Sequence, residues 1–209
     1  MRRLTLGFLL SVVMGLMVFG GLSENVQAKV VDPEDSDSVV ISGSGGIFYP
    51  FQGQAGFNGV IQAMGILSPQ ERLGVELEFR NYETEFFKAK DIDTQSYILR
   101  GIGQYFFRAH GISPYVGLGL NIAVNVLDEK EFEKQRPSTN LKQEVGIGYG
   151  VIGVMGVEVP MGQRVAFFAE GRVSADFQLI RYENQSGKDK VNLESLSGLA
   201  GMGGIRFRF

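Results

Sequence analysis

Hydrophobic and polar residues alternate with a period of two along most of the chain. In residues 73–80 the odd positions are all apolar, and the even positions hold Gly74, Glu76, Glu78 and Arg80. Residues 114–126 and 165–179 alternate in the same way. Successive side chains of a β-strand point to opposite faces, whereas a helix would mix these charges among the apolar residues. The pattern therefore predicts long strands, each with one apolar face and one polar or glycine-rich face.

Eight such strands are predicted from the alternation and from the turn residues between them. Their approximate ranges are 38–50, 56–67, 72–86, 94–108, 113–127, 142–159, 164–182 and 191–209. The second, fourth and sixth connections are short (68–71, 109–112, 160–163), and the third, fifth and seventh are longer and polar (87–92, 128–140, 183–190). The first, 51–55, is intermediate. An even number of antiparallel strands with short turns at one end and long loops at the other is typical of membrane barrels.

The predicted fold is therefore all-β: an eight-stranded antiparallel up-and-down transmembrane β-barrel. A soluble sandwich also has alternating strands, but it would have to cover the apolar face of many very long strands. Glycine favours the barrel as well. The chain has 29 glycines in 209 residues, well above the average usage of about 7%. Most lie inside the predicted strands, where glycine is best justified by tight curvature or by bulky neighbours that need room.

The N-terminal residues have the pattern of a secretory signal peptide. Arg2 and Arg3 precede an uncharged stretch from Leu4 to Ser23, and Val26-Gln27-Ala28 fits a signal-peptidase site. The apolar stretch is also long enough for the alternative of an uncleaved anchor. We predict a signal peptide over residues 1–28 with cleavage after Ala28, a flexible acidic segment over 29–37, and a barrel domain over 38–209.

Composition removes several classes of chemistry. The chain has no Cys and one His, which excludes disulfides, cysteine nucleophiles, thiolate metal sites and a multi-histidine metal site. A net charge of −3 argues against nucleic acid as a partner, because nucleic-acid-binding proteins are usually basic. The sequence therefore predicts no cofactor, no metal and no nucleic-acid partner.

Two motif matches are weak. Gly148-Tyr-Gly-Val-Ile-Gly153 fits the dinucleotide-binding pattern G-x-G-x-x-G, but it lies in a predicted strand and opens no helix. His110 and Ser113 suggest a hydrolase, but no G-x-S-x-G motif or orienting acid accompanies them. The protein is not predicted to be an enzyme.

The end of the chain resembles a known family. In Ile205-Arg-Phe207-Arg-Phe209, three apolar residues share one face and the last residue is aromatic, which resembles the C-terminal assembly signal of bacterial outer-membrane proteins. Residues 113–120 (SPYVGLGL) resemble a strand opening common in small outer-membrane barrels. The mature sequence as a whole resembles the group of the OmpA transmembrane domain, OmpX and OmpW.

This resemblance implies localisation in a bacterial outer membrane, with both termini and the short turns on the periplasmic side. It also implies contact with outer-membrane lipid and lipopolysaccharide, insertion by the outer-membrane assembly machinery, and a monomeric state. Because the chain has no Trp, Tyr and Phe would have to form the interfacial aromatic rings. The candidates on the apolar faces are Tyr49, Phe79, Tyr97, Tyr105, Phe107, Tyr149, Phe207 and Phe209.

The polar faces place charges of both signs inside the predicted barrel. These candidate lumen residues are Glu76, Glu78, Arg80, Arg100, Glu144, Glu170, Arg172, Asp176 and Arg206. The interior of an eight-stranded barrel is narrow enough for side chains to fill, and charges there must pair or be hydrated. One interpretation is a plug of ion pairs that stabilises a closed barrel. Another is a narrow conduit whose ion pairs exchange partners. A third, acid–base chemistry by Glu76 and Glu78, is weakened by the neighbouring Arg80.

The predicted function is therefore non-catalytic: a structural or surface-interaction protein of the outer membrane. A narrow channel for ions or small solutes is the alternative. A lipid-modifying enzyme is the third and weakest hypothesis.

Overall fold

The structure is a computed structural model, and it describes residues 39–86, 89–135, 140–141, 145–183 and 189–209. Eight strands form the ring: β1 (Val39–Pro50), β2 (Gly53–Ser68), β3 (Glu71–Phe86), β4 (Ala89–Phe106), β5 (Ser113–Leu127), β7 (Val145–Pro160), β8 (Val165–Glu183) and β10 (Gly198–Arg208). Three short elements accompany them: α2 (Glu129–Gln135), β6 (Asn140–Leu141) and β9 (Asp189–Ser195).

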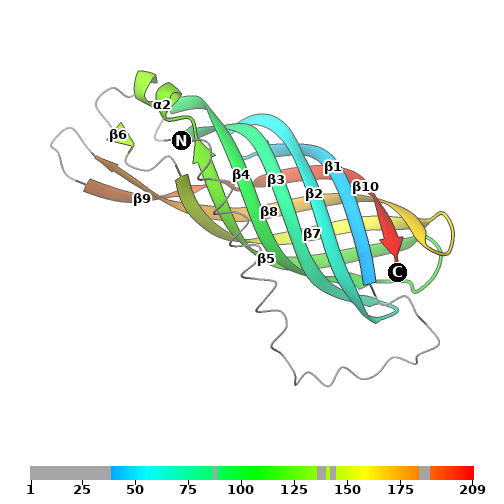
Figure 1. The fold of residues 1–209 in the computed structure, drawn as a ribbon. Helices are drawn as coiled ribbons and strands as arrows, with labels where there is room; N and C mark the ends of the chain where they lie inside the picture. Colours follow the sequence, from blue (N-terminus) through cyan, green and yellow to red (C-terminus); the bar gives the residue numbers. More distant parts are fainter. Residues whose placement is uncertain (1–38, 87–88, 136–139, 142–144, 184–188) are drawn as a thin grey trace, which may run out of the picture. The chain divides into compact units, whose positions relative to one another are not determined.

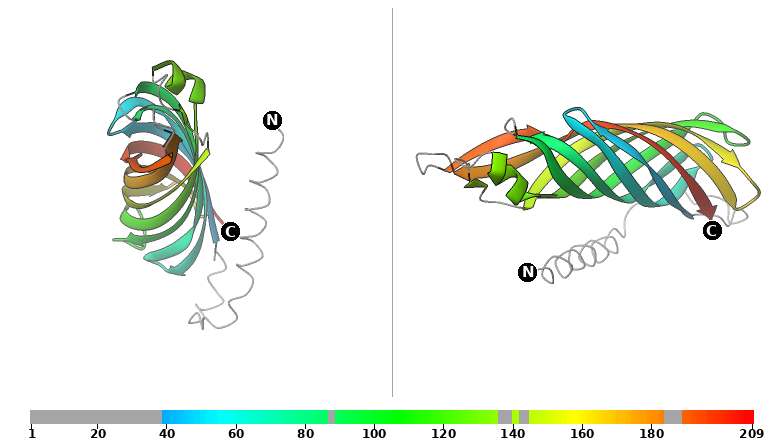
Figure 2. Two further views of the ribbon diagram at one scale, coloured as in Figure 1. Left: turned by 90° about the vertical axis from the view of Figure 1, so that its left-hand side faces the viewer. Right: turned by 90° about the horizontal axis from the view of Figure 1, so that it is seen from above.

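The ring is closed by antiparallel pairing of neighbouring strands. Each ring strand pairs with the next, and β10 pairs with both β8 and β1. The predicted eight-stranded up-and-down barrel is therefore confirmed. The strands are strongly tilted and wind around the barrel axis (Figures 1 and 2). The C-terminus lies at the end with the short turns, and α2, β6 and β9 lie at the opposite end, which we call the loop end.

Three details of the predicted strands differ from the structure. The connection 128–140, expected as a polar loop, contains the helix α2 and ends in the first residue of the short strand β6. The strand expected over 142–159 corresponds to β7, which begins at Val145 in the described residues. The strand expected over 191–209 is interrupted at Leu196 and Ser197. β8 nevertheless pairs with β9 and β10 in one continuous register, with Phe177 opposite Ser195 and Ser174 opposite Gly198.

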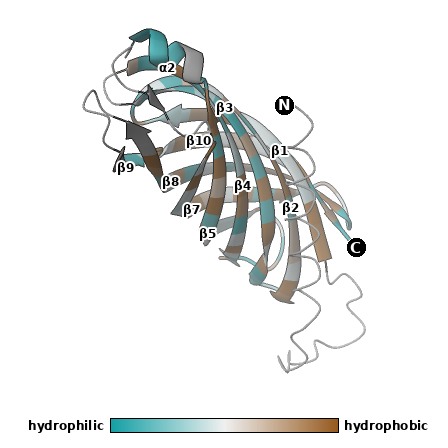
Figure 3. Cartoon of the chain, turned by 60° about the vertical axis from the view of Figure 1, so that its left-hand side comes forward, coloured by the Kyte–Doolittle hydropathy of each residue, from teal (hydrophilic) through white to brown (hydrophobic). Residues whose placement is uncertain are grey.

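The outer wall of the barrel is apolar along most of its height. Its large side chains stand exposed, among them Leu118 at 77%, Leu120 at 71% and Met155 at 68%. Figure 3 shows hydrophobic and hydrophilic residues alternating along the strands. An apolar wall around a polar interior is the arrangement of barrels that face lipid. No helix within the described ranges is long and apolar enough to cross a membrane.

Aromatic side chains lie on this outer wall near both ends. Near the loop end we define a loop-end aromatic ring, in which Phe79 lies 5.6 Å from Phe57 and 5.2 Å from Tyr97 between ring centroids. Its members are Tyr49, Phe57, Phe79, Tyr97, Tyr149 and Phe177. Near the short turns lie Tyr105, Phe107, Phe167, Phe207 and Phe209, with the rings of Tyr105 and Phe107 in edge contact at 5.7 Å. All eight aromatic residues expected from the sequence are on this wall.

Inward-facing glycines make room for large side chains in the lumen. A Cβ on Gly156 would lie 2.6 Å from the ring of Tyr115. A Cβ on Gly119 would lie 2.7 Å from the carbonyl oxygen of Gly101 and 3.3 Å from Cδ of Arg100. The glycines on β5 and β7 therefore form a thin part of the wall, against which the long side chains of the lumen pack.

Candidate functional site: the barrel lumen

The charged side chains that are buried in the lumen are equal in number for the two signs. Among the described residues, five carboxylates and five guanidinium groups are buried, and all are inward-facing positions of ring strands. They are Glu76, Glu78, Glu158, Glu170 and Asp176, and Arg72, Arg80, Arg100, Arg172 and Arg206. Because the positive and negative charges balance, every ionised group has an opposite partner available within the barrel.

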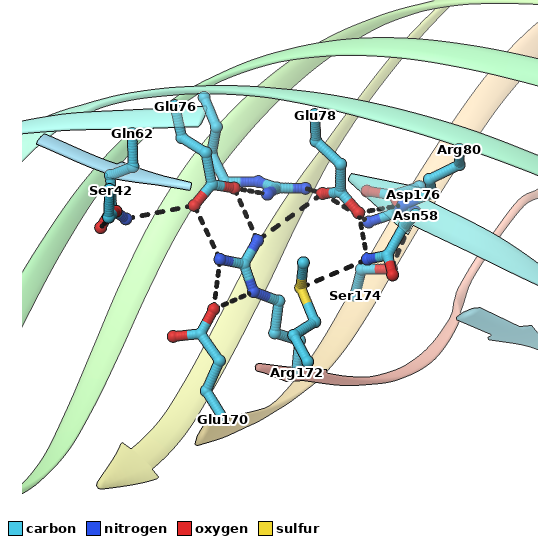
Figure 4. Close-up of polar contacts among 12 residues, drawn as sticks. Ser42, Asn58, Gln62, Glu76, Glu78, Arg80, Glu170, Arg172, Ser174 and Asp176 are labelled. Atoms are coloured by element: carbon cyan, nitrogen blue, oxygen red, sulfur yellow. Dashed lines mark hydrogen bonds and ion pairs between the residues drawn. The ribbon is translucent and has the colours of Figure 1, made fainter. Parts of the chain in front are cut away.

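The centre of the lumen is a network in which carboxylates and guanidinium groups alternate (Figure 4). Both guanidinium Nη atoms of Arg172 contact Glu76, at 2.7 and 2.9 Å, and Arg172 Nε donates to Glu170 at 2.6 Å. Arg100 contacts both Glu76 and, at 2.7 Å, Glu78. Bidentate contacts of this kind fix geometry as well as charge. We call the set around Glu76 and Glu78 the central network.

The central network extends across the barrel toward β8. Arg80 contacts Glu78 at 2.8 Å and Asp176 at 2.9 Å, so it links β3 to β8 through the lumen. The amide groups of Asn58 and Asn121 donate to Glu78 at 2.9 Å and to Asp176 at 2.7 Å. These contacts satisfy carboxylate oxygens that would otherwise be buried without a partner.

A second set of contacts, which we call the basal network, lies near the short turns. The carboxylate of Glu158 accepts hydrogen bonds from Arg72, Arg206 and Arg208, and the shortest distance to each guanidinium group is 2.7 Å. Tyr115 donates its hydroxyl proton to Glu170 at 2.6 Å and accepts from Arg206 at 3.1 Å, so it joins the basal and central networks.

Aromatic rings cover the guanidinium groups of the basal network. Arg72 lies 3.9 Å from the ring centroid of Phe106, and Arg206 lies 4.2 Å from that of Phe168. Cation–π contacts of this kind stabilise cations that have lost part of their hydration. The short-turn end of the lumen is therefore filled by stacked aromatic and guanidinium groups.

The loop end of the lumen is closed by an apolar cluster instead. Phe132 of α2 is fully buried among residues from β4, β5, β8 and the segment before β10. This lid cluster consists of Ala89, Ile92, Leu127, Phe132, Ile180 and Leu196. Gln135 anchors the end of α2 on β4, because its side chain exchanges two hydrogen bonds with the backbone of Lys90 at 2.8 and 2.7 Å.

On the exposed side of α2, Lys134 donates to Glu131 at 2.8 Å. This hydrogen bond lowers the pKa of Glu131 and raises that of Lys134. The pair lies at the surface, where such contacts contribute little to stability. The helix is therefore held by Phe132 and Gln135 rather than by its surface charges.

The structure places eight of the nine candidate lumen residues in these two networks. They are Glu76, Glu78, Arg80, Arg100, Glu170, Arg172, Asp176 and Arg206. Glu144 lies outside the described residues, as do Ala28 and the segments 1–28 and 29–37.

Three charged members of the basal network, Arg72, Glu158 and Arg208, were not among the nine candidates. Arg72 has the same parity as Glu76, Glu78 and Arg80, so extending the alternation of β3 by one step would have found it. Glu158 lies on the polar face of its predicted strand as well. The convergence of Arg72, Arg206 and Arg208 on Glu158 comes from three strands, and no local pattern reveals it.

The weak motif matches of the sequence have structural roles. The glycines of the G-x-G-x-x-G match lie within β7. Ser113 donates its hydroxyl proton to the carbonyl oxygen of Arg108, while His110 is exposed in the short turn. Within the described residues, no group of three or more His, Asp or Glu side chains could hold a metal ion.

The C-terminal residues close the barrel. Ile205, Phe207 and Phe209 all face outward, and β10 pairs with β1 from Gly198 to Arg208. Beyond the last pair, the backbones of Phe209 and Val39 exchange two hydrogen bonds at 2.9 and 3.3 Å. The role of these residues as an assembly signal stays a prediction.

Comparison with solved structures identifies the architecture. The outer membrane protein OprG from Pseudomonas aeruginosa superposes with a TM-score of 0.62 and 12% identity, covering 83% of this chain and 96% of that one. Outer membrane protein W of E. coli superposes with a TM-score of 0.50 and 13% identity, covering 83% and 98%. The chain has the fold of the small outer-membrane β-barrels. No protein family and no curated protein matches its sequence. At 12% and 13% identity, the similarity to these two proteins shows a shared fold and nothing further.

Proposed function

We propose that the protein is a structural or surface-interaction protein of a bacterial outer membrane, with a lumen closed to solutes. The observation that carries this proposal is the pairing within the lumen of all ten buried charges that the structure describes. A pore needs a continuous hydrated path, whereas here guanidinium and carboxylate groups contact one another across the barrel. The lid cluster adds an apolar closure at the loop end.

The outer wall supports the membrane location. An apolar surface bounded by aromatic residues at both ends matches the hydrocarbon layer and its two interfaces. Export through a signal peptide cleaved after Ala28, insertion by the assembly machinery, and contact with lipopolysaccharide belong to the same proposal. With the termini and the short turns on the periplasmic side, the loop end, which includes α2, faces the exterior and carries the interacting surface.

A narrow channel for ions or small solutes is the second candidate. Several buried polar atoms in the lumen make no hydrogen bond within the described part of the chain. They include both amide atoms of Gln104, together with Asn121 Oδ1, Asn125 Nδ2 and Gln178 Oε1. Buried polar atoms of this kind are usually satisfied by water, so they favour some hydration between the networks.

Single-channel recording of the refolded protein in a planar bilayer separates the two candidates. We expect no discrete openings from the wild-type protein, with folding checked by its heat-modifiable mobility on gels. Regular openings with a salt-dependent conductance would contradict the closed barrel and favour the channel. The double variant Glu76→Ala with Arg172→Ala removes one central pair and tests whether that pair limits conduction.

A further inference from the structure

The apolar outer wall does not end at the same place on all sides of the barrel. On β3 and β4, the outward positions beyond the loop-end aromatic ring are polar: Asn81 and Glu83 follow Phe79, and Gln95 and Asp93 precede Tyr97. These side chains point outward because the intervening Arg80, Tyr82, Thr94 and Ser96 are buried. On this side, the aromatic ring is the upper boundary of the apolar wall.

On β7, β8 and β9 the apolar wall continues past the same ring. Ile147 and Val145 precede Tyr149 on β7, and Leu179 follows Phe177 on β8. On β9, Leu193 pairs directly with Leu179, and Val191 is the next outward position. We call these five residues the upper apolar patch. Their side chains are all exposed, from 37% for Val145 to 65% for Ile147.

The upper apolar patch is contiguous with the apolar wall below it. Tyr149 pairs with Phe177 and with Ile122, and Ile147 pairs with Val124, so no polar residue separates the patch from the wall along β7. A contiguous exposed apolar surface of this kind marks contact with another apolar phase. The phase already proposed for the wall is the hydrocarbon of the membrane.

The other features of the β8–β9 hairpin limit how deep it lies in the membrane. Among the described elements, β9 pairs with β8 alone, so one edge of β9 carries backbone groups without strand partners (Figures 1 and 2). Such an edge is not tolerated in hydrocarbon and has to stay hydrated. The opposite face of β9 is polar, with Asn192 donating to Glu194 at 2.7 Å. An apolar outer face, a polar inner face and a free edge together fit the boundary between acyl chains and headgroups.

From this geometry we infer that the outer leaflet rises on one side of the barrel, so that the upper apolar patch contacts lipid acyl chains while β3 and β4 at the same end face water. The occupant of the patch is the membrane lipid itself. The inference rests on the proposed membrane location and adds a defined lipid-contacting face on the β8–β9 hairpin. The β3–β4 hairpin and α2 are then the parts of the loop end left to meet partners in solution.

Variants that each carry a single tryptophan test this inference, because the natural chain contains no Trp. Leu118→Trp reports the middle of the wall, and Leu193→Trp and Ile147→Trp report the upper apolar patch. Gln95→Trp is the matched control for Ile147→Trp, since each residue is one outward position beyond an aromatic residue of the ring. Each refolded protein is placed in phosphatidylcholine vesicles, with or without bromine on the acyl chains, near the carbonyl end for the upper positions and near the terminal methyl group for Leu118→Trp. The fluorescence is then also titrated with aqueous acrylamide.

We expect bromine to quench the indole fluorescence of Leu193→Trp and Ile147→Trp several-fold more than that of Gln95→Trp, and acrylamide to quench Gln95→Trp the most. Equal bromine quenching of these three variants would overturn the inference. Protection of the Leu193→Trp indole from both quenchers would also overturn it, because a second copy of the chain would then cover the patch. If the indole of a folded Leu118→Trp barrel escapes bromine, the membrane location itself is contradicted, so the two failures are distinguishable.

Discussion

Each carboxylate buried in the lumen contacts at least one guanidinium group, and several contact two or three. Removing one partner of a buried ion pair leaves an uncompensated charge, whereas replacing both partners by apolar groups is often tolerated. In the basal network a single carboxylate, that of Glu158, contacts three guanidinium groups, those of Arg72, Arg206 and Arg208. Within the described residues Arg72 and Arg208 form ion pairs with no other carboxylate, so neutralising Glu158 leaves both guanidinium groups without a counter-charge.

We expect Glu158→Gln to lower the free energy of unfolding by about 3–5 kcal/mol, the usual cost of breaking a buried pair. Urea unfolding of the refolded barrel in lipid, followed by gel mobility, measures this loss. Glu71→Gln is the matched control, since Glu71 is exposed at the same end of the barrel, and its effect should stay within about 1 kcal/mol. A Glu158→Gln barrel as stable as the wild type would show that water replaces the missing carboxylate.

At the scale of elements, the alternation in the sequence predicts the ring strands well because each residue's face depends only on its parity. The interruption at Leu196 and Ser197 leaves no trace in that pattern, since Leu193 and Leu199 keep the same parity on either side. At the interruption the contacts are made with distant segments: Leu196 N–H donates to the carbonyl oxygen of Asp176 on β8, and Phe51 N–H, in the turn after β1, donates to the carbonyl oxygen of Ser197.

The helix α2 escapes prediction for a related reason. Its seven residues, EKEFEKQ, contain one apolar side chain and no helical repeat. Isolated helices of this length are marginal in water, so packing has to stabilise them. Phe132 supplies that packing through residues that are distant in the sequence, such as Ile92 and Ile180. The lid cluster could not be predicted from the local pattern.

We therefore expect Phe132→Ala to release α2 without opening the ring. Loss of a buried Phe costs about 3–5 kcal/mol, and here the cost falls on the local docking of the helix. Trypsin should cleave several-fold faster after Lys134, while the heat-modifiable mobility of the barrel is unchanged. Phe51→Ala is the control, because Phe51 is 61% exposed at the same end and should leave the cleavage rate unaltered. An unchanged rate in Phe132→Ala would contradict the anchoring role of Phe132.

At the scale of the whole molecule, closure of the ring depends on the pairing of the first strand with the last. β1 and β10 are the most distant ring strands in the sequence, and their register runs from Pro50 opposite Gly198 to Val40 opposite Arg208. Pairing of such distant segments is entropically costly and forms late unless the ends are specified. At one of these ends Phe209 forms two backbone hydrogen bonds with Val39 and places an aromatic side chain on the outer wall.

Deletion of Phe209 should therefore impair assembly more than it impairs the finished barrel. It removes two hydrogen bonds at the seam, together with an aromatic side chain that is 61% exposed on the outer wall. We expect less protein in the outer-membrane fraction and a smaller share with heat-modifiable mobility, while the molecules that do fold resist urea nearly as well as the wild type.

Two substitutions of Phe209 separate the backbone from the side chain. Phe209→Tyr keeps the backbone and the ring and should assemble normally, whereas Phe209→Ala keeps only the backbone. If Phe209→Ala assembles as well as Phe209→Tyr, the side chain is dispensable and the seam hydrogen bonds account for the effect. If the deletion variant reaches wild-type levels in the membrane, the terminal residue is not part of an assembly signal.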